Sequence, residues 1–206
     1  HISTAKELEL FDNSIPLEQK KITAEACIHH LWFSEEQYTE KGNLIKWNPA
    51  VKKVTDRDAI LQGVLDNKID VIATDHAPHT LEEKNNTYFN APSGGPLVQH
   101  ALLAMLEKVE EGKISIERVV EKMAHSPAIL FNIVDRGYVR EGYFADLVIV
   151  DSNKTEVTKK SLLYKCGWSP FDGYKFKGTP TSTIVGGKIK MQDGKIIGDP
   201  EGKPLA

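Results

Sequence analysis

The 206-residue sequence lacks several features that mark particular classes of protein. No apolar run approaches the roughly 20 residues of a membrane-spanning helix, so we expect no membrane partner. The chain has only 2 cysteines, Cys27 and Cys166, too few for a disulfide framework, which favours a reducing cytoplasm. Its formal net charge of -3 provides no basic surface for nucleic acid. These absences argue against membrane and nucleic-acid partners.

What is present is ordinary for a globular protein, with 40% hydrophobic and 27% charged residues. Residues 1–5 (His-Ile-Ser-Thr-Ala) contain neither an initiator methionine nor a signal peptide. A helical pattern begins almost at once, over residues 4–13. We therefore expect the sequence to be a fragment from inside a longer chain.

Strand and helix patterns alternate along residues 1–136. The β-branched, apolar segment 69–74 is typical of a buried strand, and residues 22–28 form a second strand-like segment. This alternation predicts a parallel sheet with crossover helices. Further helices are expected to begin at Ser34, Thr55, Pro96, Ser115 and Ser126.

The pattern changes after Gly137. Short apolar runs alternate with glycines from there on, and Gly186-Gly187 and Asp193-Gly194 are hairpin signals. Residues 137–206 are therefore predicted to form a small β unit beside the α/β part. The apolar runs cover residues 145–150, 183–185, 189–191 and 196–197.

The most informative segment is residues 73–79, Ala-Thr-Asp-His-Ala-Pro-His. It follows the strand at 69–72 and places Asp75, His76 and His79 in a loop. A carboxylate is a hard metal ligand and a base, and neutral imidazole is the commonest nitrogen ligand. In (β/α) barrels the catalytic groups lie at the C-terminal ends of strands. An ordinary turn with surface histidines is the alternative, but the segment suits a metal-dependent hydrolase.

With residues 80–84 (Thr-Leu-Glu-Glu-Lys) after it, this motif resembles class I dihydroorotases of the amidohydrolase superfamily. The resemblance implies the C-terminal part of a metal-dependent (β/α)8 TIM-type barrel in residues 1–136. This part would hold the end of strand 6, strands 7 and 8, and the helices that follow. Residues 137–206 would be the C-terminal part of a small β-sandwich domain. Other segments match the family in the same order, at residues 1–5, 23–31, 48–49, 145–151 and 169–173.

The resemblance also implies a binuclear zinc centre, in which His1 binds one metal ion and Asp75 the other. Zinc polarises a carbonyl and lowers the pKa of water. Asp75 would take a proton from the attacking water and pass it to the leaving nitrogen. The residues that would hold the substrate are Asn48, His79, Pro92 and Gly94.

The implied reaction interconverts (S)-dihydroorotate and N-carbamoyl-L-aspartate in de novo pyrimidine biosynthesis. An allantoinase or hydantoinase would use the same scaffold. A catalytically inactive scaffold partner of aspartate transcarbamoylase is the non-enzymatic alternative. The family's His-x-His pair, bridging Asp or carboxylated Lys and further histidine ligand fall outside these 206 residues, so we expect the isolated chain to be inactive. A homodimer, with aspartate transcarbamoylase as one option for a partner, is also implied.

Several residues near the motif are given supporting roles. His29 and His30 are adjacent on a predicted strand and would point to opposite faces, which favours structural roles. Glu25 would face the barrel interior, where a further role at the metal site is open. His76 is predicted to orient the loop, and Cys27 to act as a small buried hydrophobe.

Overall fold

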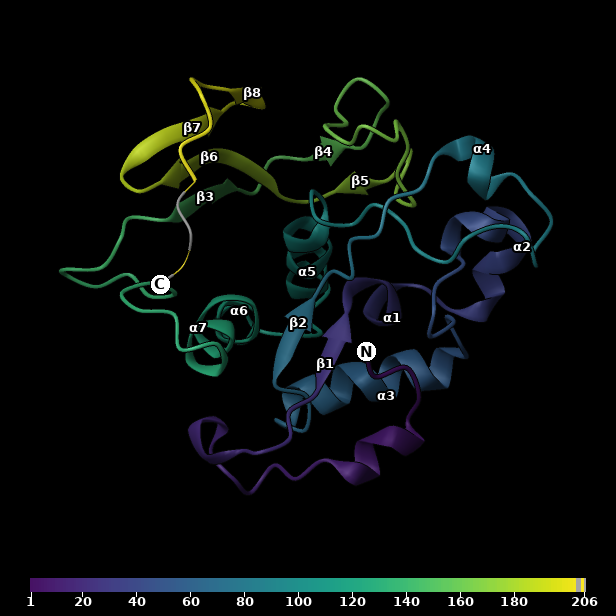
Figure 1. The fold of residues 1–206 in the computed structure, drawn as a ribbon, viewed down its shortest axis with the longest axis horizontal. Helices are drawn as coiled ribbons and strands as arrows, with labels where there is room; N and C mark the ends of the chain where they lie inside the picture. The colour runs from purple at the N-terminus through teal and green to yellow at the C-terminus, as the bar shows by residue number, and fades with distance from the viewer. Residues whose placement is uncertain (203–204, 206) are drawn as a thin grey trace.

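The structure is a computed structural model that describes residues 1–202 and 205 (Figure 1). At its centre lie two short parallel strands, β1 (Glu25–Cys27) and β2 (Val71–Ala73). The connection between them carries α1 (Ile28–Trp32), α2 (Tyr38–Lys41) and α3 (Val54–Leu65), and α3 crosses below the two strands in Figure 1. The prediction of parallel strands with crossover helices is confirmed, although both strands are shorter than the segments 22–28 and 69–74.

Short 3-10 helices occupy much of the N-terminal region. The predicted helix at 4–13 is a single 3-10 element, η1 (Lys6–Leu10), and the Glu7 carboxylate accepts the N–H groups of Ser3 and Thr4 just before it. The predicted capping box at Ser34 is present, with Gln37 as its partner. The other 3-10 elements are η2 (Leu17–Gln19), η3 (Glu35–Gln37) and η4 (Gly42–Ile45).

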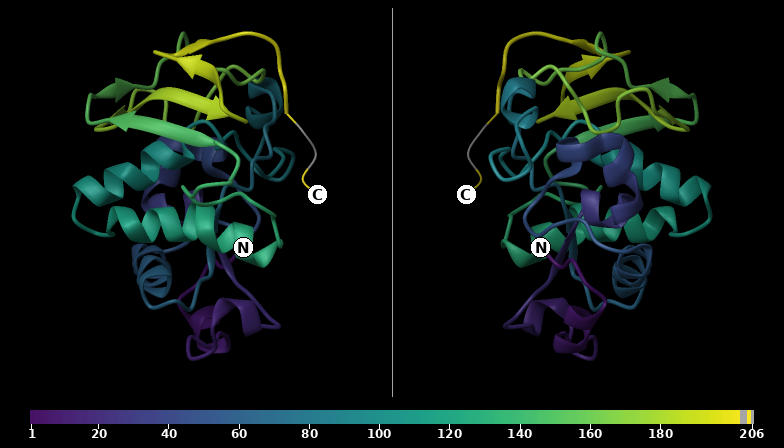
Figure 2. Two further views of the ribbon diagram at one scale, coloured as in Figure 1. Left: turned by 90° about the vertical axis from the view of Figure 1, so that its left-hand side faces the viewer. Right: turned by 90° about the vertical axis from the view of Figure 1, so that its right-hand side faces the viewer.

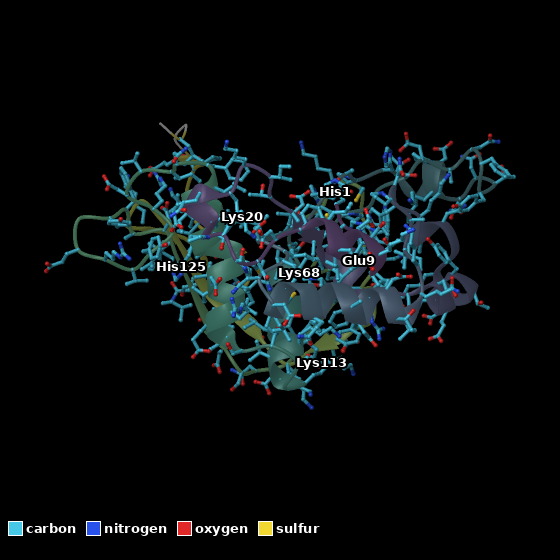
Figure 3. The ribbon with its side chains drawn as sticks, turned by 90° about the horizontal axis from the view of Figure 1, so that it is seen from below. His1, Glu9, Lys20, Lys68, Lys113 and His125 are labelled. Atoms are coloured by element: carbon cyan, nitrogen blue, oxygen red, sulfur yellow. The ribbon has the colours of Figure 1, made fainter. Side chains whose placement is uncertain are left out.

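Helices also follow β2. They are α4 (Leu81–Lys84), α5 (Ala101–Glu110) and a continuous run of α6 (Ile116–Val120), the π-helix η5 (Glu121–His125) and α7 (Ser126–Leu130). The start predicted at Pro96 is wrong. The N–H groups of Leu97 and Val98 bond to the His76 ring, residues 98–100 form a turn, and the helix begins after it at Ala101. Seen from below, Lys68, which precedes β2, lies between His1 and Lys113 (Figure 3).

The C-terminal part contains a four-stranded antiparallel sheet in the order β3-β6-β7-β8. Both predicted hairpin turns are present, since Gly186-Gly187 and Asp193-Gly194 all have positive φ as type I′ turns require. In both side views this sheet lies at one end of the molecule and η1 and η2 at the other (Figure 2). The strands are β3 (Leu147–Asp151), β6 (Thr179–Val185), β7 (Lys188–Gln192) and β8 (Lys195–Ile196), with β4 (Thr155–Glu156) and β5 (Lys175–Phe176) forming a separate pair.

Aromatic side chains join the α/β part to the C-terminal part. The Phe171 ring contacts Trp32 edge-on at 5.3 Å between centroids and Phe33 at 5.4 Å. Phe171 and Phe176 are fully buried in the same core cluster as Ile28. Burying a side chain of this size stabilises a fold by about 1.5–3 kcal/mol. The segment around Phe171 is therefore held firmly against the elements that surround β1 and β2.

Within the described part of the chain, every helix is too short or too polar to cross a membrane.

Candidate active site

Three side chains that can bind metal or move protons meet beside the two strands: His1 at the start of the chain, Glu25 at the start of β1 and Asp75 in the turn after β2. Ile2 donates its N–H to the carbonyl of Glu25 at 2.9 Å, which fixes His1 beside β1. The Nε2 atom of His1 then lies 3.3 Å from Oδ1 of Asp75, and its Nδ1 atom is paired with the Glu25 carboxylate. His1 and Asp75, distant in sequence, thus face each other.

These residues fit a metal ion. A metal-binding histidine usually gives its second ring N–H to a carboxylate, which orients the ring. Glu25 occupies that position at Nδ1, which would leave the lone pair of Nε2 for a metal ion that the Asp75 carboxylate also contacts. The His1 and Asp75 side chains are 33% and 25% exposed, which leaves them open to one side.

Cys27 lies close to this pair. Its Sγ atom is 3.2 Å from Nδ1 of His1, and its side chain is fully buried, as expected from the sequence. Burial raises the pKa of the Cys27 thiol to about 12, with the charges of Glu25 and Asp75 adding to the effect. The thiol is therefore neutral beside His1, and its Sγ atom lies within 4.8 Å of ligand atoms of His1 and Glu25.

Asp75 adopts an unusual backbone conformation. Its φ is +45°, in the left-handed region that few residues other than glycine enter. Such strained positions cluster at functional sites, where the surrounding structure imposes them. Here the strain belongs to the sharp turn that follows β2, from which the Asp75 carboxylate reaches His1.

His76, next in the chain, holds the loop instead of facing His1. Its Nδ1 atom accepts hydrogen bonds from the N–H groups of Leu97 at 3.0 Å and Val98 at 3.3 Å. The backbone of His76 also pairs in parallel with Gly95. The orienting role predicted for His76 is consistent with these contacts.

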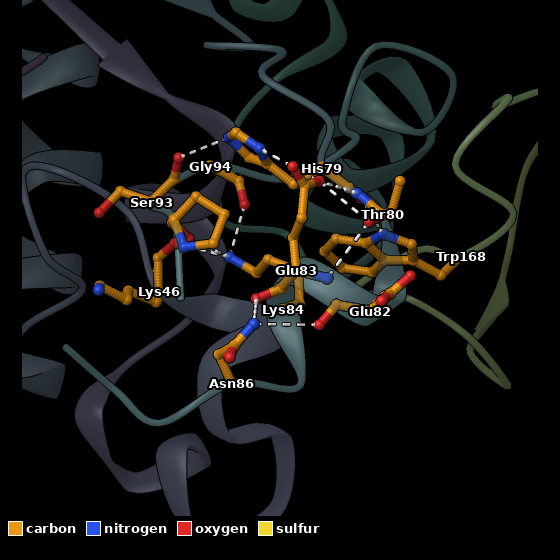
Figure 4. Close-up of polar contacts among 11 residues, drawn as sticks. Lys46, His79, Thr80, Glu82, Glu83, Lys84, Asn86, Ser93, Gly94 and Trp168 are labelled. Atoms are coloured by element: carbon orange, nitrogen blue, oxygen red, sulfur yellow. Dashed lines mark hydrogen bonds and ion pairs between the residues drawn. The ribbon is translucent and has the colours of Figure 1, made fainter. Parts of the chain in front are cut away.

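Residues 92–94 form a loop whose three consecutive carbonyls are all held by side chains (Figure 4). The ammonium group of Lys84 donates to Pro92 at 3.0 Å and to Gly94 at 2.7 Å. Nε2 of His79 lies 3.1 Å from the Ser93 carbonyl and must be the donor, because a carbonyl only accepts. The structure thus brings His79, Pro92 and Gly94, three of the predicted substrate contacts, into one unit.

Gly94 can only be glycine. Its φ is +122°, and a Cβ atom there would lie 2.5 Å from the carbonyl oxygen of Ala77. The same residue donates its N–H to the Lys46 carbonyl at 2.9 Å. The missing side chain therefore lets the loop approach the turn after β2.

Asn48, the fourth predicted substrate contact, is exposed and precedes Pro49 through a cis peptide bond. His30 supports this turn, since its Nε2 donates to the Pro49 carbonyl at 2.9 Å. His29 stacks on the Trp47 ring at 4.4 Å between centroids. The two histidines therefore brace the segment that presents Asn48.

The predicted placement of His29 and His30 on a strand is wrong. The backbone turns into α1 at Ile28, directly after β1, and both rings are buried in that helix. Burial lowers the pKa of His30 to about 4, so its ring is neutral near pH 7. The role of the two histidines, structural or in support of the metal site, stays a prediction.

Two residues of this region were not predicted from the sequence. Lys84 is 1% exposed, although lysine is rarely buried, and Trp168 is 5% exposed and donates its Nε1–H to the His79 carbonyl at 2.7 Å. Lys84 falls in the polar stretch 80–84, where no apolar pattern predicts burial. Trp168 lies 89 residues from His79 in the sequence, so only the tertiary structure shows that the two are in contact.

Comparison with known proteins identifies relatives that are named dihydroorotase or hydantoinase. The amidohydrolase family model matches residues 6–190. A dihydroorotase of Endomicrobium trichonymphae is 40% identical over 194 residues, covering 93% of this chain and 46% of the relative. A dihydroorotase of Pyrococcus furiosus is 35% identical over 206 residues, covering 100% of this chain and 47% of the relative. The chain thus spans about half the length of these curated relatives.

Solved structures give the same fold. An L-hydantoinase (dihydropyrimidinase) from Arthrobacter aurescens matches with a TM-score of 0.88 and 28% identity, over 97% of this chain and 45% of that one. A D-hydantoinase (dihydropyrimidinase) from Thermus sp. matches with a TM-score of 0.84 and 21% identity, over the same shares of 97% and 45%. The α/β prediction, part of a metal-hydrolase barrel with a small antiparallel unit, is confirmed. Because the family model matches most of this chain, the chain belongs to the amidohydrolase family.

Proposed function

We propose that the protein containing this chain is a zinc-dependent dihydroorotase, which interconverts (S)-dihydroorotate and N-carbamoyl-L-aspartate. The observation that carries this proposal is the pairing of His1, which lies beside β1, with Asp75 in the turn after the parallel strand β2. It is supported by the two dihydroorotases that match this chain at 40% and 35% identity. The remaining metal ligands would come from the half of the relatives that this chain does not cover.

The proposed metal ligands are Nε2 of His1 and a carboxylate oxygen of Asp75, with Glu25 orienting the imidazole. Zinc, when bound, would polarise the amide carbonyl and lower the pKa of water, so that hydroxide is available as the nucleophile. Asp75 accepts the proton of the attacking water and delivers it to the ring nitrogen as the carbon–nitrogen bond breaks. One carboxylate can act at both steps because it is a base before the transfer and an acid after it.

The proposed substrate contacts lie on two segments that meet near this pair. Asn48 is presented by the turn that His30 supports. His79 and residues Pro92 and Gly94 belong to the loop whose carbonyls are all engaged. A loop held in this way binds a ligand with less loss of conformational freedom than a mobile one.

A hydantoinase is the second candidate, and the fold match to the Arthrobacter aurescens L-hydantoinase favours it. Both activities open a cyclic amide, so they share the proposed roles of His1 and Asp75. An inactive scaffold partner of aspartate transcarbamoylase is a weaker candidate, because a scaffold needs no His–Asp pair of this kind. Pyrimidine biosynthesis as the pathway, a cytoplasmic location, a homodimer and the division into residues 1–136 and 137–206 stay predictions.

The test is hydrolysis of dihydroorotate by the full-length protein, with hydantoin and allantoin as parallel substrates and zinc measured on the same sample. Hydrolysis of dihydroorotate with about two zinc ions per chain is the expected result. Zinc with hydrolysis of hydantoin or allantoin instead would assign the second candidate. Absence of both zinc and activity would leave the scaffold. The isolated chain of 206 residues is expected to be inactive.

A further inference from the structure

Lys84, the last residue of α4, is one of the most deeply buried charged residues in the described chain, at 1% exposure. Burying an ammonium group is costly unless hydrogen bonds replace its water. Its Nζ atom meets three backbone carbonyls, those of Lys46 at 3.2 Å, Pro92 at 3.0 Å and Gly94 at 2.7 Å. The close-up shows Lys84 between Lys46 and Trp168, with the loop on the side of His79 (Figure 4).

The number of donors matches the number of acceptors. A lysine ammonium has three N–H bonds and no acceptor, and here each can be directed at one of the three carbonyls. Hydrogen bonds from a charged donor are roughly twice as strong as neutral ones. Burial lowers the pKa of Lys84 to about 8, and the charge of Lys46 acts in the same direction. Below that pH the full set of donors is present.

The rest of the loop is held from the other side. His79 binds the Ser93 carbonyl, and Trp168 in turn binds the His79 carbonyl. The Trp168 ring also lies near the Lys84 ammonium, 6.0 Å from its centroid, at the outer limit of a cation–π contact. Every residue from 92 to 94 is therefore tied to a buried or half-buried side chain.

We propose that Lys84 is a positioning residue, which fixes loop 92–94 against Lys46 so that the loop is set for the substrate ring before the substrate arrives. The role toward substrate rests on the function proposed above, whereas the tie between Lys84 and the loop does not. Lys84 touches only backbone carbonyls, so it acts through the loop. Preorganisation of this kind lowers the cost of binding.

The test compares Lys84→Met with Lys122→Met in the full-length protein. Lys122 is a matched control because it is also buried, at 3%, and donates to Asn67 at 2.8 Å. Lys122 lies in η5, which packs against β2. Its charge interacts with that of Asp70, which precedes β2, whereas Asp75 follows β2. Lys84→Met should raise KM for dihydroorotate about tenfold or more, with a smaller change in kcat and unchanged zinc content. Lys122→Met should leave KM as in the native protein.

Hydrogen exchange at Gly94 supplies a readout that needs no activity. Its N–H is donated to the Lys46 carbonyl, so release of the loop should speed exchange in peptides spanning 91–95. Lys84→Met should show this acceleration there and not in β2, and Lys122→Met should not show it. The native protein could fail to hydrolyse dihydroorotate while Lys84→Met, and not Lys122→Met, speeds exchange at 91–95. The proposed function would then be wrong, but Lys84 would still be shown to hold the loop.

Lys84→Gln covers the case in which Lys84→Met does not fold. Its amide keeps two N–H donors, so its KM and its exchange rate at 91–95 should fall between those of the native protein and a variant without donors. Native KM and native exchange in either folded Lys84 variant would overturn the proposal. Faster exchange throughout the chain with loss of zinc would also overturn it, because Lys84 would then be a general stability residue.

Discussion

The indole N–H of Trp168 donates a 2.7 Å hydrogen bond to the backbone carbonyl of His79, which lies 89 residues earlier in the chain. Trp168 belongs to the C-terminal part of the chain, and His79 to the loop after β2. The contact means that the C-terminal part helps to build the proposed substrate site in addition to packing against it.

Trp168→Phe should raise KM several-fold with zinc content unchanged. Phenylalanine keeps an aromatic ring beside Gly95 but leaves the partly buried His79 carbonyl without its donor, a cost of about 1 kcal/mol. Steady-state kinetics of the full-length protein over a range of dihydroorotate concentrations would measure KM. Unchanged KM would show that the bond does not support the loop.

Asp75→Asn should lower kcat by about 10²–10⁴-fold, the range typical of a lost general base or acid. Asparagine tolerates the positive φ at this position, so the turn should be preserved. Rates with dihydroorotate, together with zinc content, give the measurement. A variant with native kcat would remove Asp75 from the mechanism. Asp58→Asn, on the exposed surface of α3, should have native rates.

Asn48→Ala and His79→Ala should impair substrate use while zinc content stays native. Neither residue contacts His1, and both lie on the segments proposed to hold the substrate. KM and bound zinc, measured on the same preparations, test this. Loss of zinc in either variant would instead assign that residue to the metal site or to its support.

Gly94→Ala should destabilise the protein more than Gly112→Ala does. Both glycines have positive φ, +122° and +69°, so both substitutions strain the backbone. A Cβ at Gly94 would also collide with the Ala77 carbonyl at 2.5 Å, whereas Gly112 has no neighbour within 4 Å of that position. We expect about 1–3 kcal/mol at Gly94 and less at Gly112, read from denaturant midpoints. Equal midpoints would contradict the close approach.

His100 should make stability depend on pH in the acid range. Burial lowers its pKa to about 4, from 6.5. Between these values the unfolded chain binds more protons than the folded one, so the free energy of unfolding falls as pH drops from 6.5 to about 4.

His100→Asn removes this titration while offering an acceptor to the hydroxyl groups of Tyr164 and Ser169, which lie 3.3 and 3.2 Å from Nδ1. The slope of stability against pH in that window should decrease by up to about 1.4 kcal/mol per pH unit. Denaturant unfolding at several pH values would measure both slopes. Parallel curves for native and variant protein would show that His100 is not responsible.

Local pattern was enough to predict the strand before Asp75, the two glycine hairpins and the capping box at Ser34, because each depends on residues close in sequence. It failed where distant groups decide the backbone. The helix predicted at Pro96 begins at Ala101, and the residues before it are placed by a distant group, since the His76 ring accepts the N–H groups of Leu97 and Val98. His29 and His30 turned out helical because β1 ends at Cys27, a boundary that apolar alternation does not mark.

The predicted site residues divide in the same way. The family motif pointed to His1 and Asp75, and the structure places them 3.3 Å apart. Their roles in metal binding and proton transfer stay predictions. Lys84 could not be anticipated, because lysine in a polar stretch is normally solvated and only the assembled loop supplies its three carbonyls.

The ties around loop 92–94 have a consequence for redesigning substrate choice. A loop exchanged for that of a hydantoinase would meet Lys84 and Trp168 of this chain in place of the side chains that hold it in its own protein, because both lie outside the exchanged residues. The backbone of such a grafted loop would not be fixed by hydrogen bonds in the way that loop 92–94 is. The unit to transplant is the loop together with residues 79–84 and position 168, even though the last is remote in the chain.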